Sequence, residues 1–391
     1  MNCAYRLATV VTLLFLAQST TLPAADDPLN AKANAVLSSV TSPYEPGLAV
    51  LVEQGGKITY AKGYGVRELR DHAPITPNTN FRLASFTKQF TAMSIMLLVH
   101  DGKLRYEQTL TEIFPEFPAY GKAITVRNLL NHTGGLPDYE DLMQQEEKAA
   151  QAKWTVEHQI QDSEVLALLE KQSAGKFAPG TSWAYSNSAY VVLGLIVAKV
   201  SGMSFPDFLA QRIFSPLHMA HSVMHVEGKD KIGERAYGHS KENNAFRQTD
   251  QSSTSATLGD GGIYSNINDL AKWDQALRNH TLLREQEMAP ALEPVKLFDG
   301  SQPHWPKGTA DSDNLAPGKP VSYGFGWFLD PFAGHPRTWH TGGTMGFRTV
   351  IERFPKDDLT IIVLCNRTDL SPESLAEKIA QEAFTADSLS Q

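Results

Sequence analysis

The sequence predicts an α+β fold in which both ends of the chain build one antiparallel sheet and a mainly helical segment is inserted between them. Two β-rich runs, 47–52 and 58–61, are joined by Gly55-Gly56, which indicates a hairpin. Two more runs, 348–354 and 359–365, flank a Pro-Lys-Asp-Asp turn near the other end. Because short antiparallel strands need partners to bury their faces, a single sheet is the simplest arrangement.

The insertion is expected to be helical because apolar residues recur there with a helical period. Four of them repeat at the spacing of one helix face: Phe86, Phe90, Met93 and Leu97. Further helices are expected at about 124–131, 163–171, 188–200 and 266–279, and terminal helices at about 30–39 and 372–384.

These elements divide the chain into two layers, with a cleft expected between them. The α/β layer is predicted over about 26–84 and 321–391, and the mainly helical insertion over about 85–320. Residues 294–320 are rich in Pro, Gly and Asp, which indicates a long loop before the last strands.

The composition is that of an ordinary globular protein without a polyanionic partner. Hydrophobic residues make up 42% and charged residues 20% of the 391 positions, which excludes a disordered, collagen-like or coiled-coil chain. The formal net charge is -8, and the sequence has no basic block. Neither a nucleic-acid partner nor an anionic membrane surface is therefore expected.

Residues 1–25 have the pattern of a secretory signal peptide. Arg6 is their only charge, an apolar run covers Leu7–Ala17, and small residues follow at Ala24-Ala25. The run is shorter than the ~20 residues that a membrane-spanning helix needs, which favours cleavage over a retained anchor. We therefore expect an exported protein, periplasmic or secreted, without stable membrane insertion after cleavage. Cys365 would be its only cysteine, so no disulfide within the mature chain is expected.

Ser85 and Lys88 form the first candidate motif, Ser-x-x-Lys, where an extended segment turns into the predicted helix. At i and i+3 a hydroxyl and an amine share one helix face, so a neutral Lys88 could accept the Ser85 proton. The positive end of the helix favours the negative charge that develops. A second Ser-x-x-Lys, at Ser173 and Lys176, shows that the motif also arises by chance, and an ordinary helix start is the alternative.

Tyr185 and Asn187, in a Tyr-Ser-Asn motif, lie on a loop that leads into an apolar helix. A tyrosine there can pass a proton to a leaving group, and the Asn amide can hold a substrate carbonyl or orient Lys88. The tripeptide recurs at Tyr264, but there it opens a predicted helix, where its Ser or Asn is more simply an N-cap. The catalytic role is therefore assigned to Tyr185.

The third motif, His-Thr-Gly-Gly, precedes the final hairpin and consists of His340, Thr341, Gly342 and Gly343. We expect it on an edge strand that lines the cleft. A glycine pair on a strand lets a substrate backbone approach closely, and a free N–H there could complete an oxyanion hole with the N–H of Ser85. The same four letters recur from His132 at the end of a predicted helix, where Gly is the expected stop residue.

Together and in this order, the three motifs resemble the signature elements of the penicillin-recognising serine hydrolases. The chain is most similar to the class C β-lactamase-related family, which includes Streptomyces-type DD-peptidases, D-aminopeptidases and family VIII esterases. The resemblance covers about residues 30–385 and is carried further by the segments 83–91, 129–137, 185–194 and 261–265.

The resemblance implies a β-lactamase/DD-peptidase-like fold, with residues 26–391 as one catalytic domain. It implies an acyl-enzyme on Ser85, with Lys88 and Tyr185 as the acid/base pair. It also implies that Asn187 binds substrate and that Ser85 and Gly343 supply the oxyanion N–H groups. Neither a cofactor nor a metal is implied.

His340 is the one departure from the class C pattern, in which the third element is Lys-Thr-Gly. Histidine also stands there in Streptomyces-type DD-peptidases, which argues against efficient β-lactamase activity. An imidazole has an unperturbed pKa of about 6.5, so its charge is expected to change in the working range. If His340 holds a substrate carboxylate, that hold should weaken between about pH 5.5 and 8 relative to an uncharged ester.

A metal site at His218, His221 and His225 is the first alternative. Their spacing requires a helix, whereas Pro216 and Gly228 around them indicate turns, so structural histidines are favoured. The sequence has no His-Glu-x-x-His, Walker loop or Gly-x-Ser-x-Gly elbow, which argues against a zinc protease, a nucleotide-binding enzyme and an α/β-hydrolase.

The second alternative is a non-catalytic domain that binds penicillin or peptidoglycan stems. Loss of a reactive side chain would favour it, and Ser85, Lys88 and Tyr185 are all present. The favoured function is a serine hydrolase acting on peptide, amide or ester bonds of D-Ala-D-Ala-type or related small substrates. A DD-carboxypeptidase, a D-amino-acid peptidase, a family VIII-type carboxylesterase and a weak β-lactamase stay open, because loops such as 138–162 and 294–320 select the acyl donor.

Overall fold

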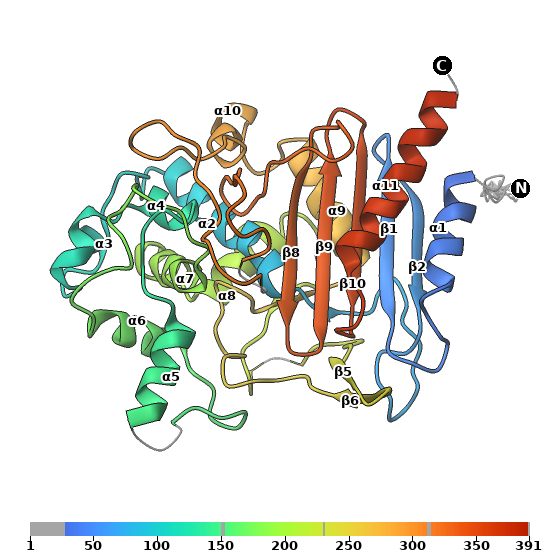
Figure 1. The fold of residues 1–391 in the computed structure, drawn as a ribbon, viewed down its shortest axis with the longest axis horizontal. Coiled ribbons are helices and arrows are strands. Elements are labelled where there is room, and N and C mark those ends of the chain that lie inside the picture. Colours follow the sequence, from blue (N-terminus) through green and yellow to red (C-terminus); the bar gives the residue numbers. More distant parts are fainter. Residues whose placement is uncertain (1–27, 150–152, 230, 311–313, 390–391) are drawn as a thin grey trace, which may run out of the picture.

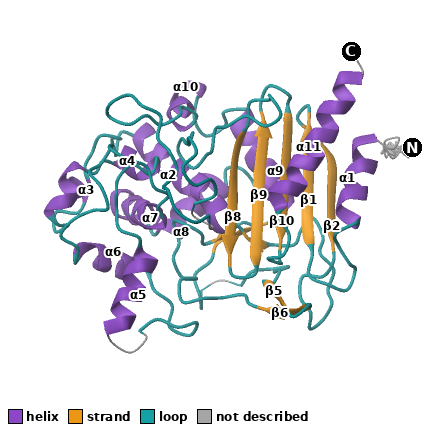
Figure 2. Cartoon of the chain, in the orientation of Figure 1, coloured by secondary structure: helices purple, strands orange, loops and turns teal. Residues whose placement is uncertain are grey.

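Two parts lie side by side in the computed structural model, which describes residues 28–149, 153–229, 231–310 and 314–389 (Figure 1). One part contains a five-stranded sheet with helices on its faces, and the other is mostly helical. The strands gather in one half of the molecule, whereas helices occur in both halves (Figure 2). The predicted leader at 1–25 lies outside the described residues.

The large sheet joins strands from both ends of the chain, as the sequence predicts. Its order is β2-β1-β10-β9-β8, and all neighbouring pairs are antiparallel. Two strands come from the N-terminal end: β1 (Leu48–Gln54) and β2 (Lys57–Tyr64). Three come from the C-terminal end: β8 (Thr338–Thr344), β9 (Phe347–Phe354) and β10 (Leu359–Cys365). The pairing of β1 with β10, which sets Val50 opposite Val363, therefore joins the two chain ends.

Alternate residues of the central strands face two separate hydrophobic cores. Leu48 and Val50 pack in the core beneath α1 (Pro28–Ser38) and α11 (Pro372–Leu389). Ala49 on the same strand belongs to the core that the sheet shares with the helical part. Because successive side chains of a strand point to opposite faces, a strand covered on both faces is apolar along its whole length.

The helical part is built around α7 (Asn187–Ser201), most of whose side chains are buried. α2 (Lys88–His100) packs against α7. The other helices are α3 (Leu110–Ile113), α4 (Val126–Leu130), α5 (Tyr139–Ala149), α6 (Asp162–Glu170), α8 (Phe205–Leu209), α9 (Ile267–Arg278) and α10 (Glu285–Met288). α9 also packs on the sheet, against β1 and β10. The helices predicted near 124–131, 163–171, 188–200 and 266–279 are thus present.

Two small sheets were not predicted from the sequence, and the second of them lies at one end of the large sheet (Figure 1). One has the order β3-β7-β4, and the other pairs β5 with β6. Their strands are β3 (Phe81–Arg82), β4 (Val223–Met224), β5 (His239–Glu242), β6 (Ala245–Gln248) and β7 (Ile263–Ser265). Strands of two to four residues are too short to show a period-2 pattern.

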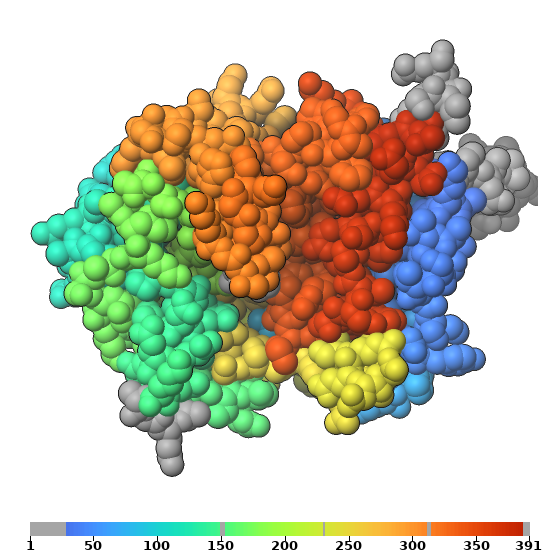
Figure 3. Space-filling view, viewed as in Figure 1, coloured from blue at the N-terminus to red at the C-terminus, as the bar shows by residue number. Residues whose placement is uncertain are grey.

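The edge strand β8 meets the helical part at the 3-10 turn Ala84–Thr87, which carries Ser85. Gly342 allows this approach, because a Cβ there would collide with the Leu83 carbonyl oxygen and the Thr349 hydroxyl. That hydroxyl donates to the Leu83 carbonyl at 2.8 Å, which ties β9 to the same segment. The chain that precedes β8, orange in Figure 3, lies over the boundary between the two parts and includes the predicted 294–320 loop.

Among the described helices, none is by itself long and apolar enough to cross a membrane. One pair bent by 77°, Asn187–Ser201 with Phe205–Phe214, reaches the threshold by length and composition.

Candidate active site

Lys88 is the buried centre of the site, at the first turn of α2. Its side chain is 0% exposed, and its Nζ donates to Ser85 Oγ at 2.9 Å and to Asn187 Oδ1 at 2.8 Å. It also donates to the backbone carbonyl of Asp260 at 3.0 Å. A primary ammonium has three N–H donors, and this one has three acceptors, one in the turn just before α2 and two from distant parts of the chain. The burial of Lys88 is therefore compensated only where all three segments meet.

Ser85 is held by the small sheet beside it. Leu83 N–H donates to the Ile263 carbonyl at 2.8 Å, and Ile263 N–H donates to the Thr87 hydroxyl at 3.2 Å. Ala84, between these anchors, has φ 50°, a left-handed conformation that costs a residue with a Cβ about 1–2 kcal/mol. Its neighbours therefore hold the turn in a strained shape that presents the Ser85 side chain to the cavities.

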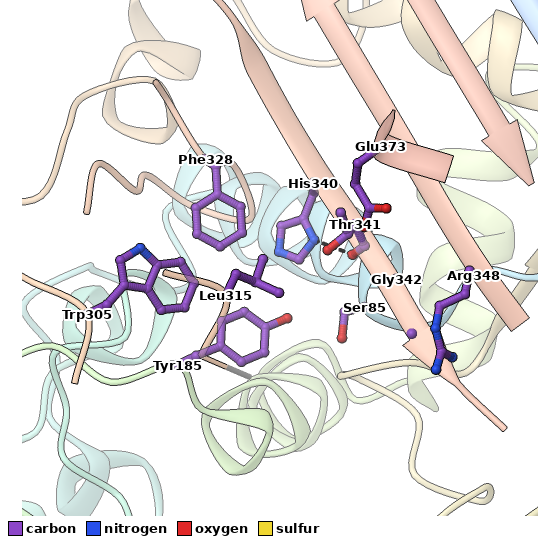
Figure 4. A pocket seen from close by; sticks show the side chains of 11 residues that line it. Ser85, Tyr185, Trp305, Leu315, Phe328, His340, Thr341, Gly342, Arg348 and Glu373 are labelled. Carbon is purple, nitrogen blue, oxygen red and sulfur yellow. Dashed lines mark hydrogen bonds between the residues drawn. The ribbon is translucent and has the colours of Figure 1, made fainter. Parts of the chain in front are cut away.

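Two cavities meet at Ser85 and Gly343. The first, of about 110 Å³, also has Tyr185, Arg348 and the third motif in its walls, with an apolar side formed by Trp305, Leu315 and Phe328 (Figure 4). The second, of about 90 Å³, has a polar lining that includes Arg82, Glu140, Asn187 and Asp260. The structure thus brings together all eight side chains or glycines proposed from the sequence: Ser85, Lys88, Tyr185, Asn187, His340, Thr341, Gly342 and Gly343.

Tyr185 reaches the first cavity from the loop before α7, and its phenol points toward Ser85 (Figure 4). Lys88 Nζ lies 4.8 Å from the centre of its ring. Ser186, the next residue, caps α7 by accepting a hydrogen bond from the Ala189 N–H at 3.1 Å. The start of α7 therefore fixes both members of the second motif relative to Lys88.

Comparison with known proteins places this arrangement in a family. A family model described as Beta-lactamase matches residues 38–384. The chain belongs to the beta-lactamase family. Penicillin-binding protein 4* of Bacillus subtilis (strain 168) is 32% identical over 333 residues, which cover 82% of this chain and 68% of that protein.

Other relatives of this beta-lactamase-family protein carry different names. A D-aminopeptidase of Cereibacter sphaeroides is 26% identical over 340 residues, or 82% of this chain and 57% of that protein. The solved D-amino acid amidase from Ochrobactrum anthropi SV3 superposes with a TM-score of 0.75 at 21% identity, covering 92% of this chain and 99% of that one. The likeness confirms the predicted fold, and the family is one of serine hydrolases.

His340 does not titrate as the sequence led us to expect. Its ring is buried, its Nδ1 donates to the Thr341 carbonyl at 2.6 Å, and its Nε2 accepts from the Tyr323 hydroxyl at 3.1 Å. Burial, with the nearby charge of Lys88, lowers the pKa of His340 to about 3. The expectation that it changes charge between pH 5.5 and 8 is therefore wrong, because the imidazole stays neutral and both nitrogens are used by the protein.

His132 is a site residue that sequence reasoning assigned only to the end of a helix. Its Nδ1 accepts a hydrogen bond from the Ser186 N–H at 3.2 Å, and its carbonyl accepts one from the Ala184 N–H at 3.2 Å. His132 therefore binds the backbone on both sides of Tyr185. The two ring centres, of His132 and Tyr185, are 4.6 Å apart. Burial lowers the pKa of His132 well below its usual value, so its ring is neutral.

The second copies of the first two motifs lie outside the site of this beta-lactamase-family protein. Tyr264 is buried on β7, where its hydroxyl accepts from Arg235 at 3.1 Å. Asn266 caps α9 by accepting the Asp269 N–H at 2.9 Å, as the sequence predicts. Ser173 is exposed after α6. Within the part of the chain that the structure describes, no group of three His, Cys, Asp or Glu side chains has the arrangement of a metal site.

The burial of His340 predicts a loss of stability on the acid side. The unfolded imidazole has a pKa of 6.5, whereas folding lowers it to about 3. Below pH 6.5 the unfolded state therefore binds a proton that the folded state does not bind, and the free energy of unfolding decreases. Relative to His340→Gln, the wild type should lose about 2 kcal/mol of unfolding free energy between pH 7.5 and 5, measured by urea denaturation.

His132 is present in both of those proteins, so its own titration cancels in the comparison. A difference that stays constant from pH 7.5 to 5 would show that His340 keeps an ordinary pKa in the folded state.

The position of His132 predicts a role in placing Tyr185. Asn tolerates the φ of 64° and offers an oxygen near the place of Nδ1, so His132→Asn should retain the Ser186 contact but lose the ring. We expect kcat to fall about tenfold, with KM changed by less than about twofold, because a misplaced acid/base group slows chemistry more than binding.

The control is the same substitution in Tyr185→Phe protein, where it should cost almost nothing more. An equal fall in kcat in that background would mean that His132 acts on the site without Tyr185.

Proposed function

We propose that this protein is a serine hydrolase that forms an acyl-enzyme at Ser85 and cleaves peptide, amide or ester bonds of D-Ala-D-Ala-type or related small substrates. One observation carries the proposal: the buried Lys88 amine lies 2.9 Å from Ser85 Oγ and is oriented by Asn187 and the Asp260 carbonyl. A serine hydroxyl needs such a base before it can attack a carbonyl.

Acylation would begin when the neutral Lys88 amine accepts the Ser85 proton as Oγ attacks the substrate carbonyl carbon. The oxyanion would be held by the N–H groups of Ser85 and Gly343, both of which border the two cavities. Tyr185 would then pass a proton to the leaving amine or alkoxide as the scissile bond breaks. Water would attack the resulting ester, release the acid and return the proton to Ser85.

The two cavities at Ser85 suit a substrate that extends on both sides of the scissile bond. The first has an apolar wall, and the second has polar and charged walls. A small-molecule or peptide substrate of carboxypeptidase type fits this division better than a simple short ester. Relatives named penicillin-binding protein and D-aminopeptidase support substrates of this chemical class. Export to the periplasm or beyond stays a prediction from the leader-like residues 1–25.

The nucleophile can be identified by covalent labelling. A fluorescent penicillin or a fluorophosphonate should label Ser85, mapped by mass spectrometry, and Ser85→Ala should lose both the label and hydrolysis by several orders of magnitude. The matched control is Ser173→Ala, which removes the serine of the second Ser-x-x-Lys and should leave both unchanged. An adduct on Ser173, or normal turnover by Ser85→Ala, would refute the assignment.

The proton shuttle can be identified by comparing two tyrosines in the same tripeptide. Tyr185→Phe should lower kcat by roughly 10²-fold, the range of a general acid/base group. Tyr264→Phe should mainly lower the melting temperature, because Tyr264 is buried beside Arg235 and is not among the residues that line the two cavities at Ser85. The reverse ranking in steady-state assays and thermal melts would show that the wrong copy was chosen.

A further inference from the structure

Among the described residues in the walls of the first cavity, Arg348 is the one positively charged side chain, since His340 is neutral. It lies on β9 directly opposite Gly343 in the register of the sheet. Because Gly343 has no side chain, the arginine lies across it: a Cβ at Gly343 would be 3.7 Å from Arg348 Nη1 and 3.9 Å from its Cζ. The guanidinium is therefore placed beside the strand residue proposed to bind the oxyanion.

The guanidinium of Arg348 is held in place by backbone and not by an acid. Its Nη1 donates to the carbonyls of Thr344 and Phe347, each at 2.8 Å. Within the described residues, no carboxylate oxygen lies within 4 Å of it, and its Nε and Nη2 have no protein acceptor. An arginine carries five N–H donors, so a planar edge is left for a ligand.

An arginine without a carboxylate partner is unusual in this part of the protein, as the other arginines around β8, β9 and β10 show. Each is paired with at least one carboxylate: Arg337 with Asp330, Glu352 and Glu377, Arg353 with Asp274, and Arg367 with Glu45 and Asp369. Burial lowers the pKa of Arg348, and the nearby carboxylate of Glu373 opposes this effect only in part, so the cost of removing the charge from water is not fully compensated.

We propose that Arg348 binds a free carboxylate of the substrate, so that this hydrolase selects peptides that end in a carboxylate over amides and esters of the same shape. The inference rests on the proposed function and specifies its substrate class. A guanidinium edge fits a carboxylate with two parallel hydrogen bonds. Ser85 lies between Arg348 and the apolar side chains of Trp305 and Phe328 (Figure 4), so one substrate can reach both walls. Arg348 thus supplies the contact that the neutral His340 does not.

The test compares an N-acyl-D-alanyl-D-alanine peptide with its C-terminal amide. The ratio of their kcat/KM values should favour the free carboxylate in the wild type and fall by roughly tenfold to a hundredfold in Arg348→Gln. Arg348→Lys keeps the charge but loses the paired geometry, so its ratio should lie between the two. Arg105→Gln, which removes an exposed cation on the helical part, should leave both turnover and the ratio unchanged.

A substitution at Glu373 should change the ratio of the two kcat/KM values in the opposite direction. The Glu373 carboxylate also lines the cavity and would repel a substrate carboxylate, so Glu373→Gln should raise the ratio by roughly two- to fivefold. An unchanged ratio in Arg348→Gln, with a rise in Glu373→Gln, would show that general electrostatics and not Arg348 selects the substrate.

Equilibrium binding to Ser85→Ala separates this inference from the proposed function. Calorimetric titration of the same peptide and amide should show a preference for the carboxylate that disappears when Arg348→Gln is added. If the preference is present but no variant hydrolyses any substrate, the proposed function fails and the Arg348 assignment holds. If the wild type hydrolyses the peptide but binding shows no such preference, or if inorganic phosphate competes as well as N-acetyl-D-alanine, the Arg348 assignment fails.

Discussion

The buried nitrogen of Lys88 is the constraint on which the site depends. A charged or polar amine cannot be removed from water unless its donors are satisfied. Its acceptors are Ser85, Asn187 and the Asp260 carbonyl, which come from the turn before α2, the start of α7 and the loop before β7. The chain therefore has to assemble these segments correctly before Lys88 can be buried, so folding and active-site geometry are coupled at one atom.

Besides the three segments that surround Lys88, the large sheet also forms part of the site, because its edge strand β8 packs closely against the turn that carries Ser85. β8 can lie against the Ser85 turn only because Gly342 has no Cβ, and the Thr349 hydroxyl holds the Leu83 carbonyl from the next strand. Strand β8 also carries Gly343, which lines both cavities. Because β9 and β10 are locked to the N-terminal strand β1, the position of β8 depends on pairing between the two ends of the chain.

The sequence was sufficient for the sheet, the main helices and the three motifs, because periodicity and turn residues are local signals. The local signal that set Tyr264 apart from Tyr185 is not sufficient by itself, because both tripeptides open a helix: Ser186 caps α7 and Asn266 caps α9. The structure adds that Tyr185 lines the cavity beside Ser85. Local signals could not show that His132 packs on Tyr185, because that contact joins the end of α4 to the start of α7 across many residues. Whether Arg348 has a carboxylate partner could not be predicted from local signals either, because it depends on which side chains come together in the folded protein.

The neutral state of His340 changes how the chemistry of Lys88 has to be understood. The charge of Lys88 contributes to the lowered pKa values of both His340 and His132, so the two imidazoles remain uncharged beside it. In a protein with Lys-Thr-Gly at this position, a second ammonium would stand near the first and would favour the neutral form of each by repulsion. Here that repulsion is absent. The rings of Tyr185 and Tyr190, whose centres lie 4.8 and 5.6 Å from Nζ, favour the charged amine. In the proposed mechanism, burial therefore has to favour the neutral base against these rings and without a neighbouring lysine.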